Sequence, residues 1–386
     1  MSNTAVNTAV IVDSVRTPLG RRNGRLAGWH PVDLAAHTLQ ALVARNDLDP
    51  AVIDDVIMGC VMQVGDQAVN VGRNAALAAG FPDTVPGTTI DRQCGSSMQA
   101  NFNAATAIWS GQLDLVVAAG AEMMSRVPMG SNGGDLSDKL LERWEIVPQG
   151  VSAEVIADEW DLSREELDAF SLESHRRAVA AIDEGRFANE VVPVDLTNPH
   201  VGVVFDVDET PRRDTSAAAL AALKPAFRAD GKVTAGNSSQ ICDGAAAVLI
   251  ASEGAAARLG LEPRARFVAF GLAGVDPHRM LHGNPQACAA ALARAGLGWD
   301  DMAVVEVNEA FASVALQFIR DARLDERTED VNPNGGGISL GHPLGATGAR
   351  ITATLLNELE RRDARYGIAT MCIGFGQAIA SVIERL

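Results

Sequence analysis

One cysteine stands in a context that is typical of a nucleophile. Cys94 follows a short extended stretch, residues 87–90, and precedes a small-residue pattern that predicts a helix over residues 99–109. Unpaired N–H groups and the positive end of the dipole at a helix N-terminus favour a thiolate. The small residues 95–97 are expected to leave room for a substrate. The alternative for this stretch is a buried structural thiol.

A histidine lies in a glycine-rich segment near the end of the chain. Residues 332–348 read Asn-Pro-Asn-Gly-Gly-Gly-Ile-Ser-Leu-Gly-His-Pro-Leu-Gly-Ala-Thr-Gly, with the histidine at position 342. Such glycines indicate positive φ angles or close backbone approach. Beside a cysteine, His342 would accept the proton of the nucleophile. The alternative is an ordinary histidine of a surface loop.

A second cysteine closes a hydrophobic strand pattern. Cys372 ends residues 368–372 and enters the turn Ile-Gly-Phe-Gly, so it is expected to face a crevice. A thiol with a pKa near neutrality there could carry a proton to or from carbon. The alternative is an inert core cysteine.

An asparagine follows another strand pattern, residues 304–307, in the motif Asn-Glu-Ala-Phe. The amide of Asn308 could orient a water or donate a hydrogen bond to an oxyanion. The alternative is a helix N-cap, a common place for asparagine.

Positive charge gathers in one stretch of an acidic chain. The net charge of the 386 residues is −17, which argues against nucleic acid or an anionic membrane as a bulk partner. Residues 211–234 contain five basic and two acidic residues, a net charge of +3. This stretch could receive a phosphorylated ligand, and the alternative is ordinary solvated charge.

Cysteine usage and the N-terminus predict a reducing, cytoplasmic environment. The five cysteines are Cys60, Cys94, Cys242, Cys288 and Cys372, and no two share the spacing of metal ligands. Residues 1–9 show neither a basic n-region nor an apolar h-region, and no apolar run reaches membrane-spanning length. We therefore expect reduced thiols, no metal and no membrane span.

Strand and helix patterns alternate over residues 9–119 and again after residue 260. This predicts an α/β protein with a mostly parallel sheet covered on both faces. Each half has a Gly-rich turn, a small-residue helix and then a hydrophobic strand, which suggests a duplicated domain. We expect one half at residues 1–120, rejoined by residues 240–260, an insertion at 121–239, and a second half at 261–386.

Taken together, the segments around Cys94, Asn308, His342 and Cys372 resemble the thiolase family in order, spacing and wording. The resemblance covers essentially the whole chain. Residues 149–154 and 168–170 are closer to bacterial degradative thiolases, including those of lipid or steroid side-chain breakdown. The resemblance implies a five-layered αβαβα fold with two similar half-domains and an inserted loop domain that holds coenzyme A.

The resemblance also implies roles. Cys94 would carry the acyl group as a thioester, His342 would accept its proton, and Cys372 would move a proton at the substrate carbon. Asn308 would share one oxyanion hole with His342 through a water, and the N–H groups of Cys94 and Gly374 would form the other. No permanently bound cofactor is implied, since coenzyme A enters as a substrate. The residues implied to contact it are Arg212, Phe227, Ser239, Gln149 and Phe311.

The implied reaction is the reversible cleavage of a 3-oxoacyl-CoA by coenzyme A, giving acetyl-CoA and a shortened acyl-CoA. Alternatives are a biosynthetic acetoacetyl-CoA-forming thiolase, a decarboxylating ketoacyl synthase, a Cys–His hydrolase and a non-catalytic thiolase-like protein that binds lipid or acyl-CoA. Ketoacyl synthases resemble the chain less, because they have histidine or asparagine at the position of Cys372.

The chain departs from the family pattern at a few positions. Phe375, Ala378 and Ser97 stand where many members have glycine, and residues 148–149 read Pro-Gln where short-chain members place His-Met. These departures concern the acyl chain length and not the reaction class. Family members are at least dimers, so a homodimer or homotetramer is expected, with residues 123–135 as a candidate contact region.

Overall fold

The strands of both halves form one mixed sheet of ten strands. The computed structural model describes residues 7–196 and 203–386. Residues 1–6, part of the stretch inspected for a secretion signal, and residues 197–202, part of the insertion, lie outside the described residues. The strands of the sheet are β1 (Ala9–Arg16), β2 (Gly20–Arg21), β3 (Asp55–Gly59), β4 (Gly87–Ile90), β5 (Leu115–Met123), β8 (Cys242–Ser252), β9 (Ala265–Gly274), β10 (Met302–Val307), β11 (Tyr366–Ile373) and β12 (Gln377–Arg385).

The helices follow the predicted patterns closely. They are α1 (Pro31–Arg45), α2 (Val71–Ala78), α3 (Ser96–Trp109), α4 (Asp138–Leu141), α5 (Gln149–Glu159), α6 (Arg164–Asp183), α7 (Ala217–Ala221), α8 (Glu253–Leu259), α9 (Asn284–Ala295), α10 (Ala312–Asp321) and α11 (Thr347–Arg361). Helices α4, α7 and α8 were not predicted, and α3 begins three residues earlier than its sequence pattern. Among the described residues, no helix has the length and apolar character needed to cross a membrane.

The prediction of a mostly parallel sheet is wrong. The strand order is β10-β11-β12-β9-β1-β8-β5-β3-β4, with β2 beside β8. Only β3 with β4, β3 with β5, and β10 with β11 pair in parallel. Strands β11 and β12 are joined by a short turn, which forces an antiparallel pair. Within residues 7–196 and 203–386, the two halves of the sheet meet only where Val10 and Ile11 of β1 pair with Arg266 and Ala265 of β9.

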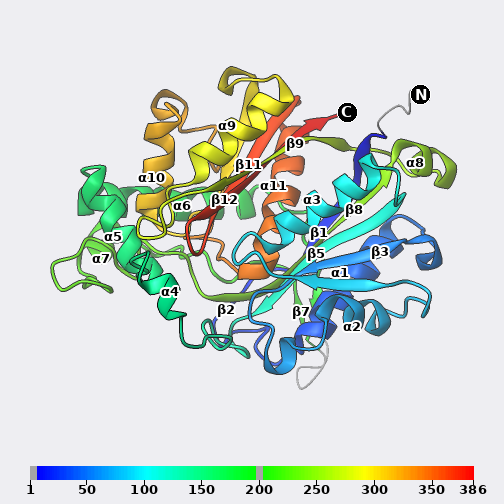
Figure 1. The fold of residues 1–386 in the computed structure, drawn as a ribbon, viewed down its shortest axis with the longest axis horizontal. Coiled ribbons are helices and arrows are strands. Elements are labelled where there is room, and N and C mark those ends of the chain that lie inside the picture. Colours follow the sequence, from blue (N-terminus) through cyan, green and yellow to red (C-terminus); the bar gives the residue numbers. More distant parts are fainter. Residues whose placement is uncertain (1–6, 197–202) are drawn as a thin grey trace.

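Two helices lie between the two halves of the sheet. Helices α3 and α11 contact each other and strands of both halves, and they lie side by side at the centre of Figure 1. Helices α1 and α2 pack on the outer face of the first half, while α9 packs on the outer face of the second. The result is the expected order of five layers, αβαβα, with one apolar core in each of the two outer gaps and one around the central helices.

Glycines allow the central helices to approach closely. An ideal Cβ at Gly348 of α11 would lie 2.1 Å from the backbone nitrogen of Met98 in α3. Cβ atoms at Gly59 and Gly120 would come within 2.4 Å and 2.7 Å of backbone or side-chain atoms of Ser97. The start of α3 is therefore held against both the sheet and α11 at van der Waals distance.

The insertion is attached to the first half by a buried arginine. Arg16 of β1 donates to Glu190 at 2.7 Å and to both carboxylate oxygens of Asp208 at 2.7 and 2.9 Å. Helices α5 and α6 are separate, and a capping box formed by Ser163 and Glu166 begins α6. The insertion also holds a small two-stranded sheet, β6 (Val194–Asp195) with β7 (Val204–Phe205).

The close contact between α3 and α11 leads us to a prediction about the stability of the folded protein. We expect Gly348→Ala to lower the free energy of unfolding by about 1–3 kcal/mol, because the added methyl group must displace the backbone of Met98. Chemical denaturation checks this. The control is Gly254→Ala in α8, where the nearest atom lies 4.0 Å from the added Cβ. That control should be neutral or stabilising by up to about 1 kcal/mol. Equal unfolding midpoints for the two variants would contradict the prediction.

Candidate active site

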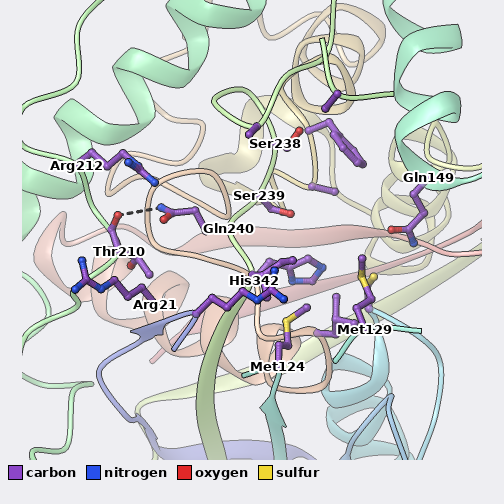
Figure 2. A pocket seen from close by; sticks show the side chains of 18 of the residues that line it. Arg21, Met124, Met129, Gln149, Thr210, Arg212, Ser238, Ser239, Gln240 and His342 are labelled. Carbon is purple, nitrogen blue, oxygen red and sulfur yellow. Dashed lines mark hydrogen bonds between the residues drawn. The ribbon is translucent and has the colours of Figure 1, made fainter. Parts of the chain in front are cut away.

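One cavity is lined by eight of the ten predicted site residues, which come from distant parts of the chain; Asn308 and Gly374 do not line it. It has a volume of about 950 Å³, and it is lined by Cys94, His342 and Cys372. All five residues that were implied to contact the coenzyme line the same cavity: Gln149, Arg212, Phe227, Ser239 and Phe311. Figure 2 shows Arg212 on one side of His342 and Gln149 on the other. The cavity thus has a reactive region and a cationic side.

The turn before α3 holds Cys94 at a strand-to-helix junction, as predicted. Gln93 adopts a φ of 46°, which turns the chain sharply before the cysteine. Gly95 does not leave room for a substrate, since a Cβ there would lie 2.6 Å from Cδ1 of Ile373. Ser96 and Ser97 are fully buried and bonded to protein atoms. The expectation about residues 95–97 is therefore wrong, because these residues are small for the sake of protein packing.

Burial outweighs the helix N-terminus in setting the protonation of Cys94. Removal from water raises the pKa of the Cys94 thiol to about 12, and only part of this is offset by hydrogen bonds from the N–H groups of Cys94 and Gly374 and from the Gln149 side chain. The expectation of a resting thiolate is wrong for this reason. The same contacts place Gly374 and Gln149 next to the sulfur.

Cys372 lies at the end of β11 with 1% of its surface exposed. Burial, and then the neighbouring Cys94 sulfur, raises the pKa of the Cys372 thiol well above its usual range. The expectation of a pKa near neutrality is wrong, since a buried thiol loses the water that stabilises its charged form. The two thiols line the same cavity, and the Cys94 sulfur is near enough to affect the pKa of Cys372.

His342 is buried and held in one tautomer. Its Nδ1 lies 2.6 Å from Oγ1 of Thr347, and that hydroxyl donates to the carbonyl of Pro343 at 2.9 Å. Because the hydroxyl proton is engaged there, Nδ1 must carry the proton and Nε2 must present a lone pair. Burial, and then the charge of Arg350, lowers the pKa of His342 to about 3. The imidazole is therefore neutral at rest, and a surface-loop histidine is excluded.

The side chain of Asn308 faces that lone pair. Its Nδ2 lies 3.3 Å from Nε2 of His342, while its Oδ1 is buried without a partner among the described residues. Helix α10 begins at Ala312 with Phe311 as its N-cap, so the alternative of an N-cap asparagine is excluded. The next residue, Glu309, fixes the segment by accepting hydrogen bonds from Ser174, Asn332 and the N–H of Ile338.

A buried carboxylate that sequence reasoning missed joins the two halves beside the site. Glu122 at the end of β5 accepts hydrogen bonds from the N–H groups of Val61, Met62 and Gly345 at 2.9–3.1 Å, and from the Gln67 amide at 2.6 Å. Gly345 lies three residues after His342. No local pattern in the sequence signals this contact, since its partners come from two distant segments, residues 61–67 and residue 345.

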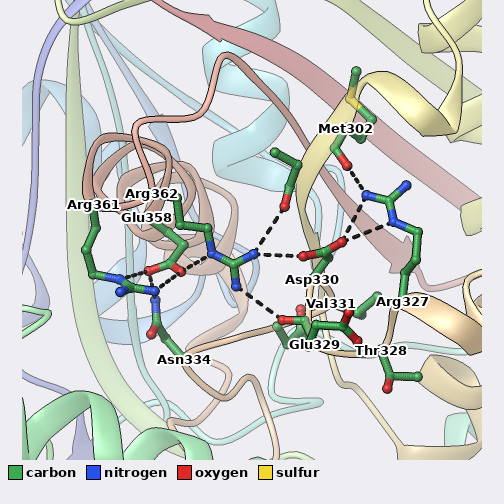
Figure 3. A network of polar contacts seen from close by, with 12 residues as sticks. Met302, Arg327, Thr328, Glu329, Asp330, Val331, Asn334, Glu358, Arg361 and Arg362 are labelled. Carbon is green, nitrogen blue, oxygen red and sulfur yellow. Dashed lines mark hydrogen bonds and ion pairs between the residues drawn. The ribbon is translucent and has the colours of Figure 1, made fainter.

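An ion-pair network holds the segment that leads to His342 (Figure 3). Asp330 accepts from Arg327 at 3.0 Å and from Arg362 of α11's C-terminal end at 2.8 Å. Glu358 of α11 accepts from Arg362 at 2.6 Å and from Asn334 at 3.0 Å. Residues 327–334 are thereby fixed to the far end of the helix that begins just after His342.

The basic stretch, residues 211–234, is mostly neutralised within the protein. Arg228 and Lys232 pair with Asp158 at 2.8 and 3.1 Å, and Arg213 pairs with Asp183. Ordinary ion pairing therefore accounts for three of the five basic residues of this stretch, while Arg212 and Arg213 line the cavity. Sequence reasoning missed Arg21 and Arg22, which line it from the first half of the chain.

The departures from the family pattern have separate structural accounts. Ser97 accepts a hydrogen bond from the N–H of Ala349 at 2.9 Å, so it caps α11 from the other half. The methyl group of Ala378 fits because residue 283 is glycine. A Cβ atom added at Gly283 would lie only 3.0 Å from the Cβ atom of Ala378. Phe375 has a φ of 62° and is 45% exposed, a strained position next to the N–H of Gly374.

Comparison with known proteins identifies the family of this chain. Residues 9–254 match the thiolase N-terminal domain and residues 261–385 match the thiolase C-terminal domain. A steroid 3-ketoacyl-CoA thiolase of Mycobacterium tuberculosis is 46% identical over 98% of this chain and 94% of its own length. A 3-ketoacyl-CoA thiolase of Erwinia tasmaniensis is 48% identical over 98% of this chain and 99% of its own length. The crystal structure of a Bacillus anthracis acetyl-CoA acetyltransferase has a TM-score of 0.92, 42% identity and full coverage of both chains. The chain therefore belongs to the thiolase family.

Proposed function

We propose that this protein is a degradative thiolase, an acyl-CoA C-acyltransferase that cleaves 3-oxoacyl-CoA with coenzyme A. The observation that carries the proposal is the arrangement of two neighbouring thiols and a neutral imidazole in one cavity that is cationic on one side. Carbon–carbon cleavage by thiolysis needs a nucleophile, a base, a proton donor for carbon and sites for two oxyanions. Each has a residue of suitable chemistry here.

In the first half-reaction, Nε2 of His342 takes the proton of Cys94, whose sulfur attacks the 3-oxo carbon of the substrate. The bond between C2 and C3 then breaks. Cys372 gives its proton to C2, so that acetyl-CoA leaves and the shortened acyl group stays on Cys94 as a thioester. His342 with Asn308 on one side, and the N–H groups of Cys94 and Gly374 on the other, would stabilise the two oxyanions.

In the second half-reaction, coenzyme A gives its thiol proton to the Cys372 thiolate and attacks the thioester. Collapse of that adduct releases the shortened acyl-CoA and a Cys94 thiolate, which recovers its proton from His342. Both cysteines and the histidine return to their neutral forms. The raised pKa of Cys94 and the lowered pKa of His342 support this resting state.

We assign the coenzyme to the side of the cavity formed by the insertion. In this proposal residues 1–120 with 240–260 form one half-domain, residues 261–386 form the other, and residues 121–239 form the loop domain that holds coenzyme A. Four of the proposed contacts lie in or next to that insertion: Gln149, Arg212, Phe227 and Ser239. No permanently bound cofactor takes part in the proposed steps.

Assembly and compartment are part of the same proposal. We expect a homodimer or homotetramer, as for other members of the family, with exposed residues of the stretch 123–135 such as Met129 near a contact. Light scattering with size-exclusion chromatography measures this. The five cysteines are free, which supports action in the reducing cytoplasm.

A biosynthetic acetoacetyl-CoA thiolase is the second candidate, because the Bacillus anthracis protein is named an acetyl-CoA acetyltransferase. Intact-protein mass after mixing with acetoacetyl-CoA, or with a long-chain 3-oxoacyl-CoA, separates the two. For the degradative enzyme we expect an acyl adduct on Cys94 that forms faster from the longer substrate and clears when coenzyme A is added. A faster adduct from acetoacetyl-CoA favours the second candidate. Binding of either substrate without an adduct points to a non-catalytic protein.

The two thiols should be separable by mutation. Cys94→Ser should abolish the acyl adduct, because a hydroxyl is a far weaker nucleophile than a thiol. Cys372→Ala should still be acetylated at Cys94 by acetyl-CoA, yet lose condensation by about 10²- to 10⁴-fold, since proton transfer at carbon is removed. Mass spectrometry and steady-state rates measure the two effects. Cys288→Ala, in the core away from the cavity, is the control and should keep activity. Carbon–carbon activity in both site variants would refute the assignment of roles.

The tautomer of His342 depends on Thr347. We expect Thr347→Val to lower kcat by at least about 10-fold, because the Nδ1–H group loses its acceptor and the imidazole no longer presents Nε2 as the base. Thr347→Ser keeps the hydroxyl and should restore the rate. The pH profile of kcat should change for the valine variant only. If valine and serine give the same rate and profile, the hydroxyl does not hold the tautomer.

A further inference from the structure

Four arginines from two separate chain segments line the cavity. Arg21 and Arg22 come from β2 and the turn after it, and Arg212 and Arg213 come from the insertion. Figure 2 shows Arg21, Thr210 and Arg212 together on the same side of His342, with Met129 and Gln149 on the other side. A ligand whose reactive group meets Cys94 would extend its far end toward these cations.

These arginines are only partly neutralised by the protein. Arg213 is bonded to Asp183, at 2.6 and 3.0 Å. Nε of Arg21 lies 3.8 Å from the carboxylate of Glu209, and its side chain is 69% exposed, so this pair is weak. In the part of the chain that the structure describes, no ion pair engages Arg22 or Arg212. A chain with a net charge of −17 therefore keeps a local excess of guanidinium groups here.

Backbone hydrogen bonds hold Arg21 and Arg22 at the cavity. Gly20 and Arg21 pair with Asp243 and Cys242 of β8, the strand that follows the cavity-lining residues 238–241. The carboxylate of Glu209 accepts hydrogen bonds from the N–H groups of Arg21 and Arg25, both at 2.9 Å. Glu209 thus serves mainly as a backbone anchor for the turn, which leaves the guanidinium groups of Arg21 and Arg22 available to a ligand.

We propose that Arg21 and Arg22 form, together with Arg212 of the insertion, a binding site for phosphate groups of the coenzyme moiety. Recognition of the anionic end of the substrate is then divided between the first half-domain and the insertion. Guanidinium groups suit this task because their N–H donors match phosphate oxygens in pairs. The inference rests on the proposed function, since the thioester end must lie at Cys94.

The test compares ligands with and without phosphates. Arg21→Ala, Arg22→Ala and the double variant are assayed with coenzyme A and with pantetheine, which has the same thiol end and no phosphate. We expect the double variant to raise the KM for coenzyme A by about 10-fold or more while kcat changes little. The KM for pantetheine should equal that of the unmodified enzyme. Dephospho-coenzyme A lacks the 3′-phosphate of coenzyme A and keeps the diphosphate. An increase in KM that persists with this ligand shows that the arginines contact the diphosphate, and an increase that vanishes shows that they contact the 3′-phosphate.

Arg25→Ala is the matched control. It removes the same charge from the same turn, but its side chain stacks on Phe205 and does not line the cavity. Its KM for coenzyme A should match that of the unmodified enzyme. Equal increases for Arg22→Ala and Arg25→Ala, or an equal increase with pantetheine, would overturn the proposal. Calorimetric binding of coenzyme A and pantetheine tests the same site without turnover, so a failure of the proposed reaction is distinguishable from a failure of this inference.

Discussion

The site depends on one buried carboxylate that is shared by both halves of the molecule. Glu122 is fully buried and is surrounded by four N–H donors, from Val61, Met62, Gln67 and Gly345. Without this acceptor each donor would be left unsatisfied in the interior, at about 1–3 kcal/mol apiece. The contact reaches from the half that carries Cys94 to the turn that carries His342, so it sets the position of one catalytic turn relative to the other.

The same requirement for close approach explains the small residues around the site. The central helices meet where Gly348 lies against the backbone of Met98, and Ser97 caps the start of α11 across the boundary. A cysteine and a histidine that are 248 positions apart in the chain can share a cavity only if these helix starts are in contact. The packing of the central helices therefore brings the reactive residues together, and the glycines are needed for this packing rather than for substrate access.

Burial also decides the resting state of the chemistry. Removing the thiols and the imidazole from water favours their neutral forms, so the pKa of Cys94 is raised and the pKa of His342 is lowered. In the proposed reaction the thiols and the imidazole become charged only when a substrate is bound. The oxyanion that then forms on the substrate lies close to hydrogen-bond donors that are already in place. Such preorganised donors stabilise a developing oxyanion without a cost of rearrangement at the moment of reaction.

Local pattern in the sequence determined most elements and the identity of the chemical groups. The sequence pattern predicted helix α3 and the alternating strands and helices of both halves, because those signals depend only on neighbouring residues. The segments around Cys94, Asn308, His342 and Cys372 likewise identified the family. The tertiary structure alone decided the strand directions, the neutral forms of Cys94 and His342, the role of Glu122 and the place of Arg21 and Arg22. These properties depend on burial and on contacts between segments far apart in the chain, which no local pattern encodes.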